Sequence, residues 1–240
     1  FFCETIAEKN NPVNLSPDEK KHVFKVLRAR EGDKIILLNG KGKTAVAKIA
    51  NDSQIIIESI QSHIQPDFAI SLFVAIPRLT GMDQIISYAC ETNVAEITPI
   101  ICNYSVAIPD KVEKWRRKIV ESCKQSKNPF FPKMNPTLKF AEALKIAAKS
   151  SHIFFGCANN EKSNVYQPKA KSISWFVGPE GGFSNGEINE FRKNKATPLK
   201  LSPYIMRVGT AAIAGIILLS ETFRQDRSDR LSSGRGLVDP

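Results

Sequence analysis

The sequence predicts an α/β protein in which a parallel-sheet domain follows a small β-rich domain. Residues 1–66 contain short runs of β-branched residues separated by turn-forming segments, which is typical of a small antiparallel β structure. From residue 68 onward, apolar strand candidates alternate with helical stretches, and this alternation favours a parallel sheet covered on both faces. We therefore expect domains at 1–66 and 67–224, followed by a polar, flexible tail at 225–240.

We expect the front domain to be a small barrel with one or two helices. Three strands are predicted, at residues 34–38, 44–49 and 54–60. Two turn-forming segments separate them, at 39–43 and 51–53. A helix is predicted from Ser16 to Arg28, because Ser16 can cap it, Pro17 suits its first turn and Glu19 stands at its third position.

The second domain is predicted to hold five strands and five helices. The strands are expected at residues 70–76, 96–101, 153–157, 173–178 and 198–201. The helices are expected at residues 81–92, 110–125, 138–149, 184–193 and 210–223. The last helix is rich in Ala and Gly, which suits very close packing, including packing against a second subunit.

The positive charge of the chain is concentrated in one segment. The formal net charge is +10, and Lys111–Lys149 alone carries 11 Lys and Arg against 3 Glu, a net charge of +8. A localised basic surface favours a polyanion such as nucleic acid. The alternative is a solvated helical face that only keeps the protein soluble.

Cysteine and histidine patterns indicate neither a metal site nor a disulfide framework. Five cysteines are scattered without a C-x-x-C pair, and three histidines stand far apart. Reduced thiols favour a cytoplasmic protein. No apolar run approaches the roughly 20 residues of a membrane span, and the first residues do not resemble a signal peptide, so we expect no membrane association. Because the sequence begins without Met, we expect a trimmed start.

The first candidate for a ligand site is the turn Gly178-Pro179-Glu180-Gly181-Gly182. It follows an apolar strand and precedes a helix start at Ser184, with Glu187 at the capping-box position. Ligands of open α/β sheets bind beyond the carboxyl ends of strands, glycines permit close backbone approach, and Glu180 offers a carboxylate to a hydroxyl or ammonium group. The pattern is not that of a dinucleotide site. An ordinary strand-to-helix turn remains the alternative.

The second candidate is the segment Pro198–Ala211, which contains a strand, a proline bend, a lone Arg207 and a helix of small residues. Leu201, Ile205 and Met206 can form an apolar clamp for a flat ring whose edges the backbone amides would read. When the segment is taken alone, core packing is the favoured explanation of the same apolar residues.

Together these segments resemble the RsmE family of the SPOUT methyltransferases. The two motifs are G-P-E-G-G-F-S-x-x-E at 178–187 and L-x-x-x-I-M-R-x-x-T-A at 201–211. The resemblance covers nearly the whole chain. It includes segments similar to the family's PUA-like RNA-binding domain, at Phe1-Phe2, 22–28, 32–33 and 39–42. It also includes segments similar to the first strand–helix–strand unit and the E-x-x-x-Q helix, at 77–78, 82–83, 90–91, 94–97, Pro99, Glu121 and Gln125.

The resemblance implies a fold, a reaction and a set of site residues. The fold is a trefoil-knotted, SPOUT-type parallel-sheet domain behind a PUA-like barrel, forming a homodimer through the knotted domain. The reaction is methylation of N3 of a uridine in 16S ribosomal RNA, free or in the assembled small subunit, with S-adenosylmethionine as cofactor. The cofactor site would comprise Gly178, Pro179, Glu180, Gly181, Leu201, Ser202, Ile205 and Met206. The catalytic residues would be Arg207 and Thr210, and the RNA-binding residues Lys25, Arg28 and Arg78.

These residue types suit the implied chemistry. A sulfonium methyl group is already activated, so the enzyme mainly aligns donor and acceptor. The N3 proton must leave uracil, and a nearby cation such as Arg207 would favour the anionic base, although a permanently protonated guanidinium cannot accept that proton. The general base is therefore unassigned. Because N3 lies on the pairing edge, the target uridine must be unpaired or flipped out.

Several positions depart from the family pattern. Ser202, Tyr204 and Gly209 replace a usual Gly, Arg and Glu, and Thr92-Asn93 replaces Leu-Gly. Tyr104 and Asn128 stand where basic residues are common, and an Arg before Phe1 is missing. Two other functions therefore stay open: a catalytically silent RNA-binding relative, and a methyltransferase that acts on a ribose 2′-hydroxyl.

Overall fold

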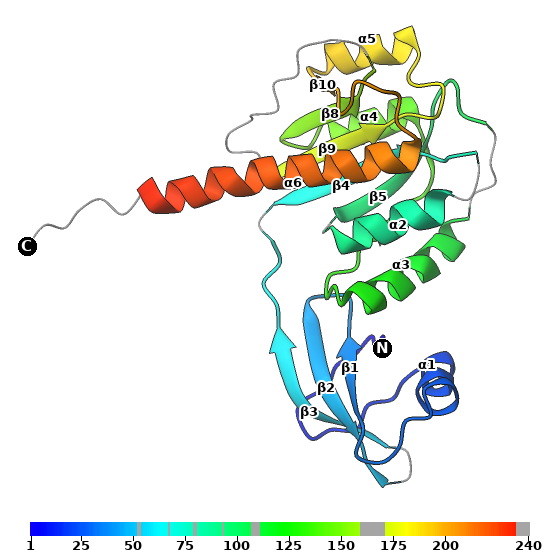
Figure 1. The fold of residues 1–240 in the computed structure, drawn as a ribbon, viewed down its shortest axis with the longest axis vertical. Coiled ribbons are helices and arrows are strands. Elements are labelled where there is room, and N and C mark those ends of the chain that lie inside the picture. The colour runs from blue at the N-terminus through cyan, green and yellow to red at the C-terminus, as the bar shows by residue number, and fades with distance from the viewer. Residues whose placement is uncertain are drawn as a thin grey trace, which may run out of the picture. The chain divides into compact units, whose positions relative to one another are not determined.

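The computed structural model describes residues 1–51, 54–66, 68–78, 81–92, 94–106, 111–158 and 171–233, the last ten of these as backbone (Figure 1). The turn residues Asp52 and Ser53, the substituted Asn93 and the tail residues 234–240 lie outside this description. The chain forms two compact units. One comprises Phe1–Pro66 with Arg117–Phe131, and the other comprises Asp67–Arg116 with Pro132–Pro240. Sequence analysis placed the whole of 117–131 in the second domain.

The front unit begins with a short helix, α1 (Pro17–Lys21), that continues as a π-helical turn over His22–Val26. The expected capping is present, because the Ser16 hydroxyl accepts a hydrogen bond from the backbone N–H of Glu19 at 3.3 Å. The helical segment ends at Val26, two residues before the predicted end, and Arg28 takes a left-handed backbone conformation with φ of 54°.

Three antiparallel strands follow, in the spatial order β1–β2–β3, with bounds Lys34–Leu38, Lys43–Ile49 and Ile55–Ser62. The predicted strands are thus confirmed to within two residues. The amino-terminal segment lies along both edges of this sheet, since Phe2 pairs with Leu38 and Pro12 pairs with Ile56. This arrangement gives the predicted small β-rich domain one core, formed by apolar side chains of the sheet, of the amino-terminal segment and of the π-helical turn.

The β1–β2 turn binds a segment from much later in the chain. The backbone N–H of Gly42 donates to Pro129 O at 2.9 Å, and that of Phe131 donates to Gly40 O at 3.0 Å. Gly40 and Gly42 have φ of 72° and 90°, and a β carbon at either position would lie closer than 3.0 Å to the ring of Phe131 or Phe130. Both positions therefore require glycine for two reasons: the backbone conformation is left-handed, and the phenylalanine rings occupy the space of a side chain.

The second unit is built on one parallel sheet in the order β10–β8–β9–β4–β5–β6, with β7 beside β5. Its strands are β4 (Ala69–Ala75), β5 (Val94–Ile101), β6 (Lys133–Met134), β7 (Leu138–Lys139), β8 (His152–Gly156), β9 (Ser172–Val177) and β10 (Thr197–Leu199). Its helices are α2 (Gly81–Glu91), α4 (Phe140–Ala147), α5 (Asn185–Lys193) and α6 (Val208–Ser233), and α3 (Val112–Ser126) begins in it. All five predicted strands are confirmed, whereas the two-residue strands β6 and β7 were not predicted.

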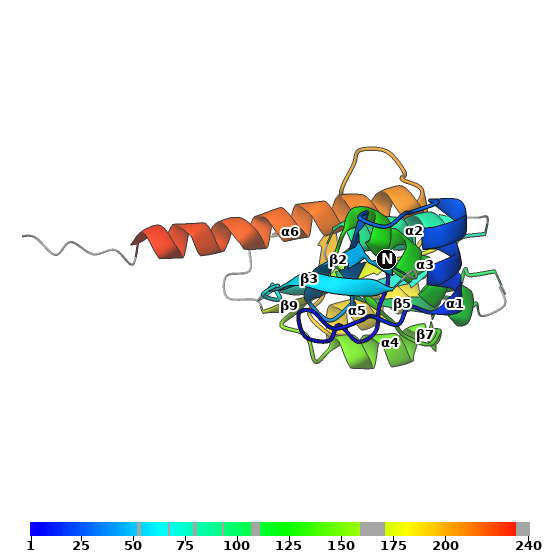
Figure 2. The same cartoon turned by 90° about the horizontal axis from the view of Figure 1, so that it is seen from below.

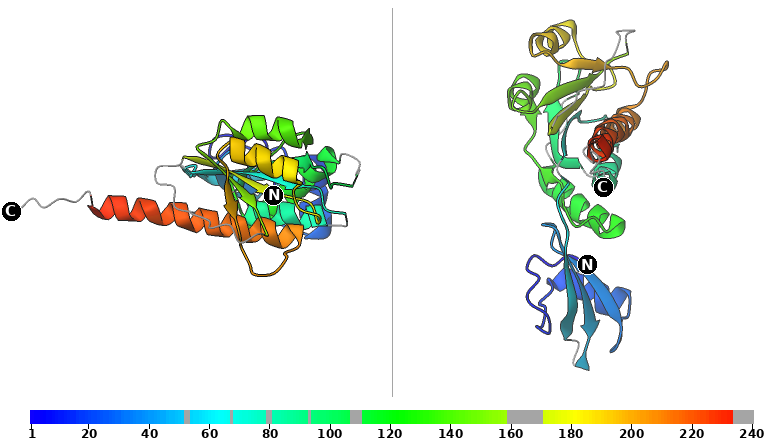
Figure 3. Two further views of the ribbon diagram at one scale, coloured as in Figure 1. Left: turned by 90° about the horizontal axis from the view of Figure 1, so that it is seen from above. Right: turned by 90° about the vertical axis from the view of Figure 1, so that its left-hand side faces the viewer.

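Helices cover both faces of this sheet, as the alternating pattern predicted (Figures 2 and 3). Helices α4 and α5 lie on one face, over a core of phenylalanine rings. In this core Phe73 stacks on Phe176 with ring centroids 4.5 Å apart, and Phe155 stacks on Phe191 at 4.3 Å. Helices α2 and α6 contact each other and lie on the opposite face.

Helix α6 packs directly on Trp175, which is fully buried. A β carbon at Gly215 would lie 2.3 Å from Trp175 Cε2, so this glycine lets the helix backbone approach the indole. The helix runs on to Ser233, whereas sequence analysis ended it at Phe223 and expected a flexible tail from residue 225. The polar sequence of 225–233 therefore continues the helix, because a helix that is already nucleated propagates easily through residues that would not start one.

Candidate active site

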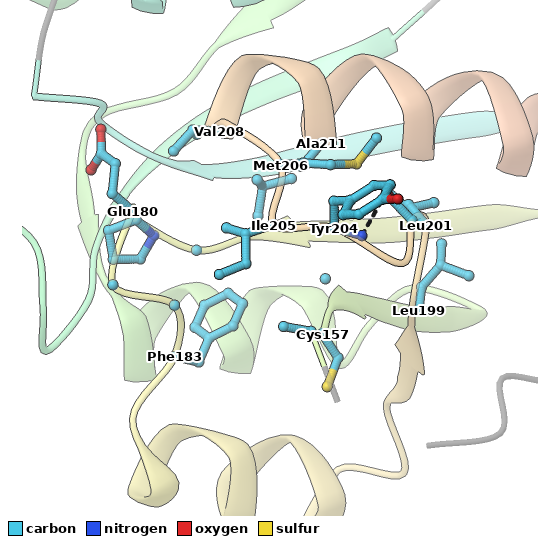
Figure 4. A pocket seen from close by; sticks show the side chains of 18 residues that line it. Cys157, Glu180, Phe183, Leu199, Leu201, Tyr204, Ile205, Met206, Val208 and Ala211 are labelled. Carbon is cyan, nitrogen blue, oxygen red and sulfur yellow. Dashed lines mark hydrogen bonds between the residues drawn. The ribbon is translucent and has the colours of Figure 1, made fainter. Parts of the chain in front are cut away.

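A pocket of about 230 Å³ lies at the carboxyl ends of β8, β9 and β10 (Figure 4). Parallel strands end at one edge of their sheet, so the loops that follow them meet there. The pocket is lined by residues 156–158, 177–183, 199, 201, 202, 204–206, 208 and 211. These include all eight residues expected to hold the cofactor. The structure thus brings the two sequence motifs together around one cavity.

The loop 178–183 needs its glycines for its shape. The backbone N–H of Gly182 donates to Pro179 O at 2.8 Å, which closes a turn, and Gly182 has φ of 72°. A β carbon at Gly178 would lie 3.2 Å from the ring of Phe183 and 3.3 Å from the carbonyl carbon of Gly182. Phe183 in turn packs on the phenylalanine core, with its ring 4.9 Å from that of Phe191. The pocket wall is therefore anchored in the core of the sheet.

The Glu180 side chain makes a contact that the sequence did not predict. Its Oε1 accepts a hydrogen bond from the backbone N–H of Arg78 at 3.1 Å, which ties this loop to the segment after β4. Figure 4 shows the carboxylate at the rim, turned away from Ile205 and Phe183. One carboxylate oxygen is thus used within the protein. The other, Oε2, has no hydrogen-bond partner within the part of the chain that the structure describes.

The second loop, between β10 and α6, presents apolar side chains to the cavity. Its turn is closed by Ser202, whose hydroxyl accepts a hydrogen bond from the backbone N–H of Tyr204 at 3.0 Å. The serine that replaces the family's usual glycine therefore gives the loop an additional hydrogen bond. Tyr204 and Ile205 are 82% and 88% exposed, although both line the pocket, and the Ile205 side chain points toward Phe183 (Figure 4).

The predicted catalytic residues lie beside the pocket and not in its wall. Arg207 and Thr210 are both exposed and alternate with Met206, Val208 and Ala211, which do line it. Among the described residues, nothing forms a hydrogen bond or an ion pair with the Arg207 side chain. This agrees with the substitution at Gly209, which removes a carboxylate that could orient the guanidinium.

The predicted RNA-binding residues are divided between the two units. Lys25 and Arg28 are exposed in the front unit, on either side of Val26 and Leu27, which are 63% and 57% exposed. Arg78 is exposed in the second unit and contacts Glu180 through its backbone. The structure therefore brings only Arg78 next to the pocket.

The part of the pocket that β8 supplies was not predicted from the sequence. Gly156, Cys157 and Ala158 line the cavity at the end of this strand, and their small size at the end of a predicted strand is the signal that could have identified them. Cys157 is also the only one of the five cysteines that is not buried. No cluster of three or more His, Cys, Asp or Glu side chains suited to a metal occurs among the described residues. Within the same residues, every helix is too short or too polar to cross a membrane.

Comparisons with known proteins agree with this geometry. Residues 65–220 match the model of the RNA methyltransferase domain, and residues 15–58 match that of the RNA methyltransferase PUA domain. A ribosomal RNA small subunit methyltransferase E from Aquifex aeolicus is 28% identical over 91% of this chain and 97% of its own. The protein of the same name from Buchnera aphidicola (Acyrthosiphon pisum) is 26% identical over 93% of each chain.

Two solved structures share the fold. A Legionella pneumophila methyltransferase in complex with S-adenosylmethionine is 26% identical, with a TM-score of 0.82 over 92% of this chain and 96% of its own. A Neisseria gonorrhoeae ribosomal RNA small subunit methyltransferase E bound to S-adenosylmethionine is 22% identical, with a TM-score of 0.84 over 93% and 97%. The expected class, a SPOUT-type parallel-sheet domain behind a PUA-like domain, is confirmed. The domain match covers well over half of the sequence, so this chain belongs to the RNA methyltransferase family.

Proposed function

We propose that this chain transfers a methyl group from S-adenosylmethionine to N3 of a uridine in small-subunit ribosomal RNA. The observation that carries the proposal is the pocket at the carboxyl ends of β8–β10 in a chain that matches an RNA methyltransferase domain. The loop 178–183 and the loop between β10 and α6, which hold the two sequence motifs, meet at this pocket. The relatives named as small-subunit methyltransferases cover nearly the full length of this chain, which supports the same substrate class.

The residues around the pocket fit the cofactor. Leu201, Ile205 and Met206 offer apolar surface to a flat purine, and the glycines of loop 178–182 leave backbone open to its polar edges. The unused Oε2 of Glu180 stands at the rim, where it can accept a hydrogen bond from an ammonium group. When bound, S-adenosylmethionine supplies a methyl group that is already activated by its sulfonium charge.

The exposed Arg207 suits a role toward the base. Arg207 comes directly after Met206, which lines the pocket. No group among the described residues forms a hydrogen bond or an ion pair with its guanidinium. Its charge favours the N3-deprotonated form of uracil and so makes N3 a better acceptor. The neighbouring hydroxyl of Thr210 can hydrogen-bond to a uracil carbonyl, which would fix the orientation of the ring.

The RNA contacts are assigned to exposed cations. Lys25 and Arg28 flank two exposed apolar residues, and this combination suits an RNA strand with phosphates and unpaired bases. Arg78 stands next to the cofactor loop and is assigned to a phosphate near the target. We also propose that the chain works in the cytoplasm, which a ribosomal RNA substrate and the pattern of reduced thiols favour.

We also propose that two copies pair through the second unit. Helix α6 packs on the sheet with Trp175 below it, yet Ile217 and Leu218 on the same helix remain 49% and 40% exposed. With Tyr204 and Ile205 they leave several large apolar side chains uncovered around the pocket loops and α6. A second copy would bury this surface, and sedimentation at micromolar concentration should then give twice the chain mass of 26.7 kDa.

The function is tested by methyl transfer from labelled S-adenosylmethionine to small-subunit ribosomal RNA, followed by nucleoside analysis. We expect the label in 3-methyluridine. Label in a 2′-O-methyl nucleoside would contradict N3 chemistry, and absence of cofactor binding at high micromolar concentration would contradict any transfer activity. Parallel reactions with free RNA and assembled subunits identify the physiological substrate.

The role of Arg207 is tested by Arg207→Ala. We expect this variant to lose methyl transfer while its cofactor Kd stays within roughly threefold of wild type, because the side chain does not line the pocket. Arg192→Ala, which removes an exposed arginine on α5, is the matched control and should retain activity. Full activity of Arg207→Ala would remove this residue from the mechanism.

A further inference from the structure

An exposed tyrosine from a third loop lies against the cofactor loop. A β carbon at Gly181 would be 3.2 Å from Cβ and 3.5 Å from Cγ of Tyr104, so the two residues are in close contact. Tyr104 follows β5, which is parallel to β4 and β9, and its loop therefore leaves the sheet at the edge that holds the pocket. Its side chain remains 52% exposed.

The backbone around Tyr104 is held on both sides. The N–H of Asn103 donates to Oε1 of the buried Glu187 at 2.9 Å. The N–H of Cys102 donates to the Ser105 hydroxyl at 2.9 Å, and the N–H of Ser105 donates back to Cys102 O at 3.0 Å. These bonds fix the backbone from which the tyrosine side chain extends, so less backbone entropy is lost when a ligand binds to it.

The ring itself has no polar or aromatic partner within the described residues. No hydrogen bond is made by its hydroxyl, and no other aromatic ring packs on it. An exposed aromatic side chain on a hydrogen-bonded turn beside a reaction site offers a flat surface to a ligand. Unpaired RNA bases stack on such rings, and methylation at N3 requires that the target base leave its pair.

We infer that Tyr104 is a substrate-positioning residue that stacks on an unpaired RNA base next to the target uridine. The inference rests on the proposed function, because it assigns a contact to the RNA that this site would methylate. A tyrosine and a cation at this position would differ in the contact that they make with RNA. A cation would bind a phosphate in a salt-dependent manner, whereas a stacked ring binds with little dependence on salt.

The test compares Tyr104→Ala, Tyr104→Leu, Tyr104→Phe and Tyr104→Trp with wild type in methyl transfer to small-subunit RNA at saturating S-adenosylmethionine. Stacking on an aromatic ring is worth about 1–3 kcal/mol per base, so the Ala and Leu variants should raise KM for RNA at least about fivefold. The Phe and Trp variants should keep a KM near that of wild type. Tyr88→Ala is the control, because Tyr88 lies on α2 and its hydroxyl accepts a hydrogen bond from Gln84. This variant should keep the wild-type KM for RNA.

Two further measurements separate stacking from a structural role. The cofactor Kd, measured by calorimetry, should not differ between wild type and the Ala variant, and the rise in KM should be the same at low and high salt. An unchanged KM in the Ala and Leu variants, or a loss confined to cofactor affinity, would overturn the inference. A rise in KM that disappears at high salt would overturn stacking. An inactive wild-type protein would instead refute the proposed function.

Discussion

The close approach of helix α6 to Trp175 gives a sharp stability prediction. Replacing Gly215 by Ala would place a β carbon 2.3–2.6 Å from three atoms of the Trp175 indole, which is fully buried and cannot swing into solvent. Overpacking of a buried site typically costs about 1–3 kcal/mol. The helix gains about 1 kcal/mol from the higher propensity of Ala. Because the contact is so short, we take the upper end of the overpacking cost, about 3 kcal/mol. Subtracting the gain in helix propensity, we expect the free energy of unfolding to fall by about 2 kcal/mol.

The assay is denaturant unfolding followed by tryptophan fluorescence, together with a thermal scan. For a chain of this size the loss corresponds to a fall in Tm of about 4–8 °C. Helix α6 also contributes Val208 and Ala211 to the pocket, so cofactor affinity should fall as well. Adding Trp175→Leu should recover part of the loss in a double-mutant cycle.

A matched glycine supplies the control for this prediction. Gly186 is exposed in α5, and the nearest atom to its β-carbon position is the Ser184 hydroxyl at 3.9 Å. Gly186→Ala should therefore leave stability unchanged or raise it by up to about 1 kcal/mol. If Gly215→Ala were as stable as Gly186→Ala, the close packing of α6 on Trp175 would be refuted.

Three other predictions follow from buried polar groups and from the pocket. Glu187→Ala should destabilise the protein by about 2 kcal/mol in denaturant unfolding, because it removes a capping box and the charged acceptor of the Asn103 N–H. A loss below about 0.5 kcal/mol would contradict this. Burial lowers the pKa of His152 below its usual 6.5, so the unfolded chain takes up the proton first as the pH falls. The free energy of unfolding should then decrease below about pH 6.5, and His152→Gln should flatten that decrease. Iodoacetamide should modify Cys157 before the four buried cysteines; at one of these, Cys102, burial and the Glu187 carboxylate also raise the pKa of the thiol. Because Cys157 lines the pocket, S-adenosylmethionine should slow its modification. Equal rates with and without the cofactor would mean that the cofactor binds elsewhere.

Local sequence patterns were sufficient for most elements of the fold. Helix caps and strand periodicity depend only on neighbouring residues. The cap at Ser16 and the capping box of Ser184 and Glu187 were predicted, and the bounds of the predicted strands were correct to within two residues. The two-residue strands β6 and β7 were missed because so short a strand has no periodicity and exists only through pairing with β5. The extension of α6 to Ser233 was missed because its composition is polar.

The site was predictable where it consists of contiguous motifs. The residue patterns alone left Gly178–Gly181 and Leu201–Met206 open between a ligand site and ordinary structure, and the resemblance of the two motifs to a known family led to the prediction that they share a site. The contact of Glu180 with Arg78 joins residues 102 positions apart, and the contact of Gly181 with Tyr104 also joins distant segments. The contribution of β8 likewise comes from outside the two motifs. Such contacts depend on the order of strands in the sheet, which no local pattern specifies.

The pairing of the β1–β2 turn with segment 128–131 determines when the front unit can be completed during synthesis. The hydrogen bonds of Gly40 and Gly42 require Phe131 and Pro129, and Glu19 requires its 2.6 Å ion pair with Lys124. A ribosome that has released only the first 66 residues has therefore released an unfinished unit. A fragment cut at residue 66 would carry two uncovered glycines and a buried carboxylate without its cation. The front unit becomes whole only after α3 has emerged, which makes its folding non-local even though its three strands are adjacent in sequence.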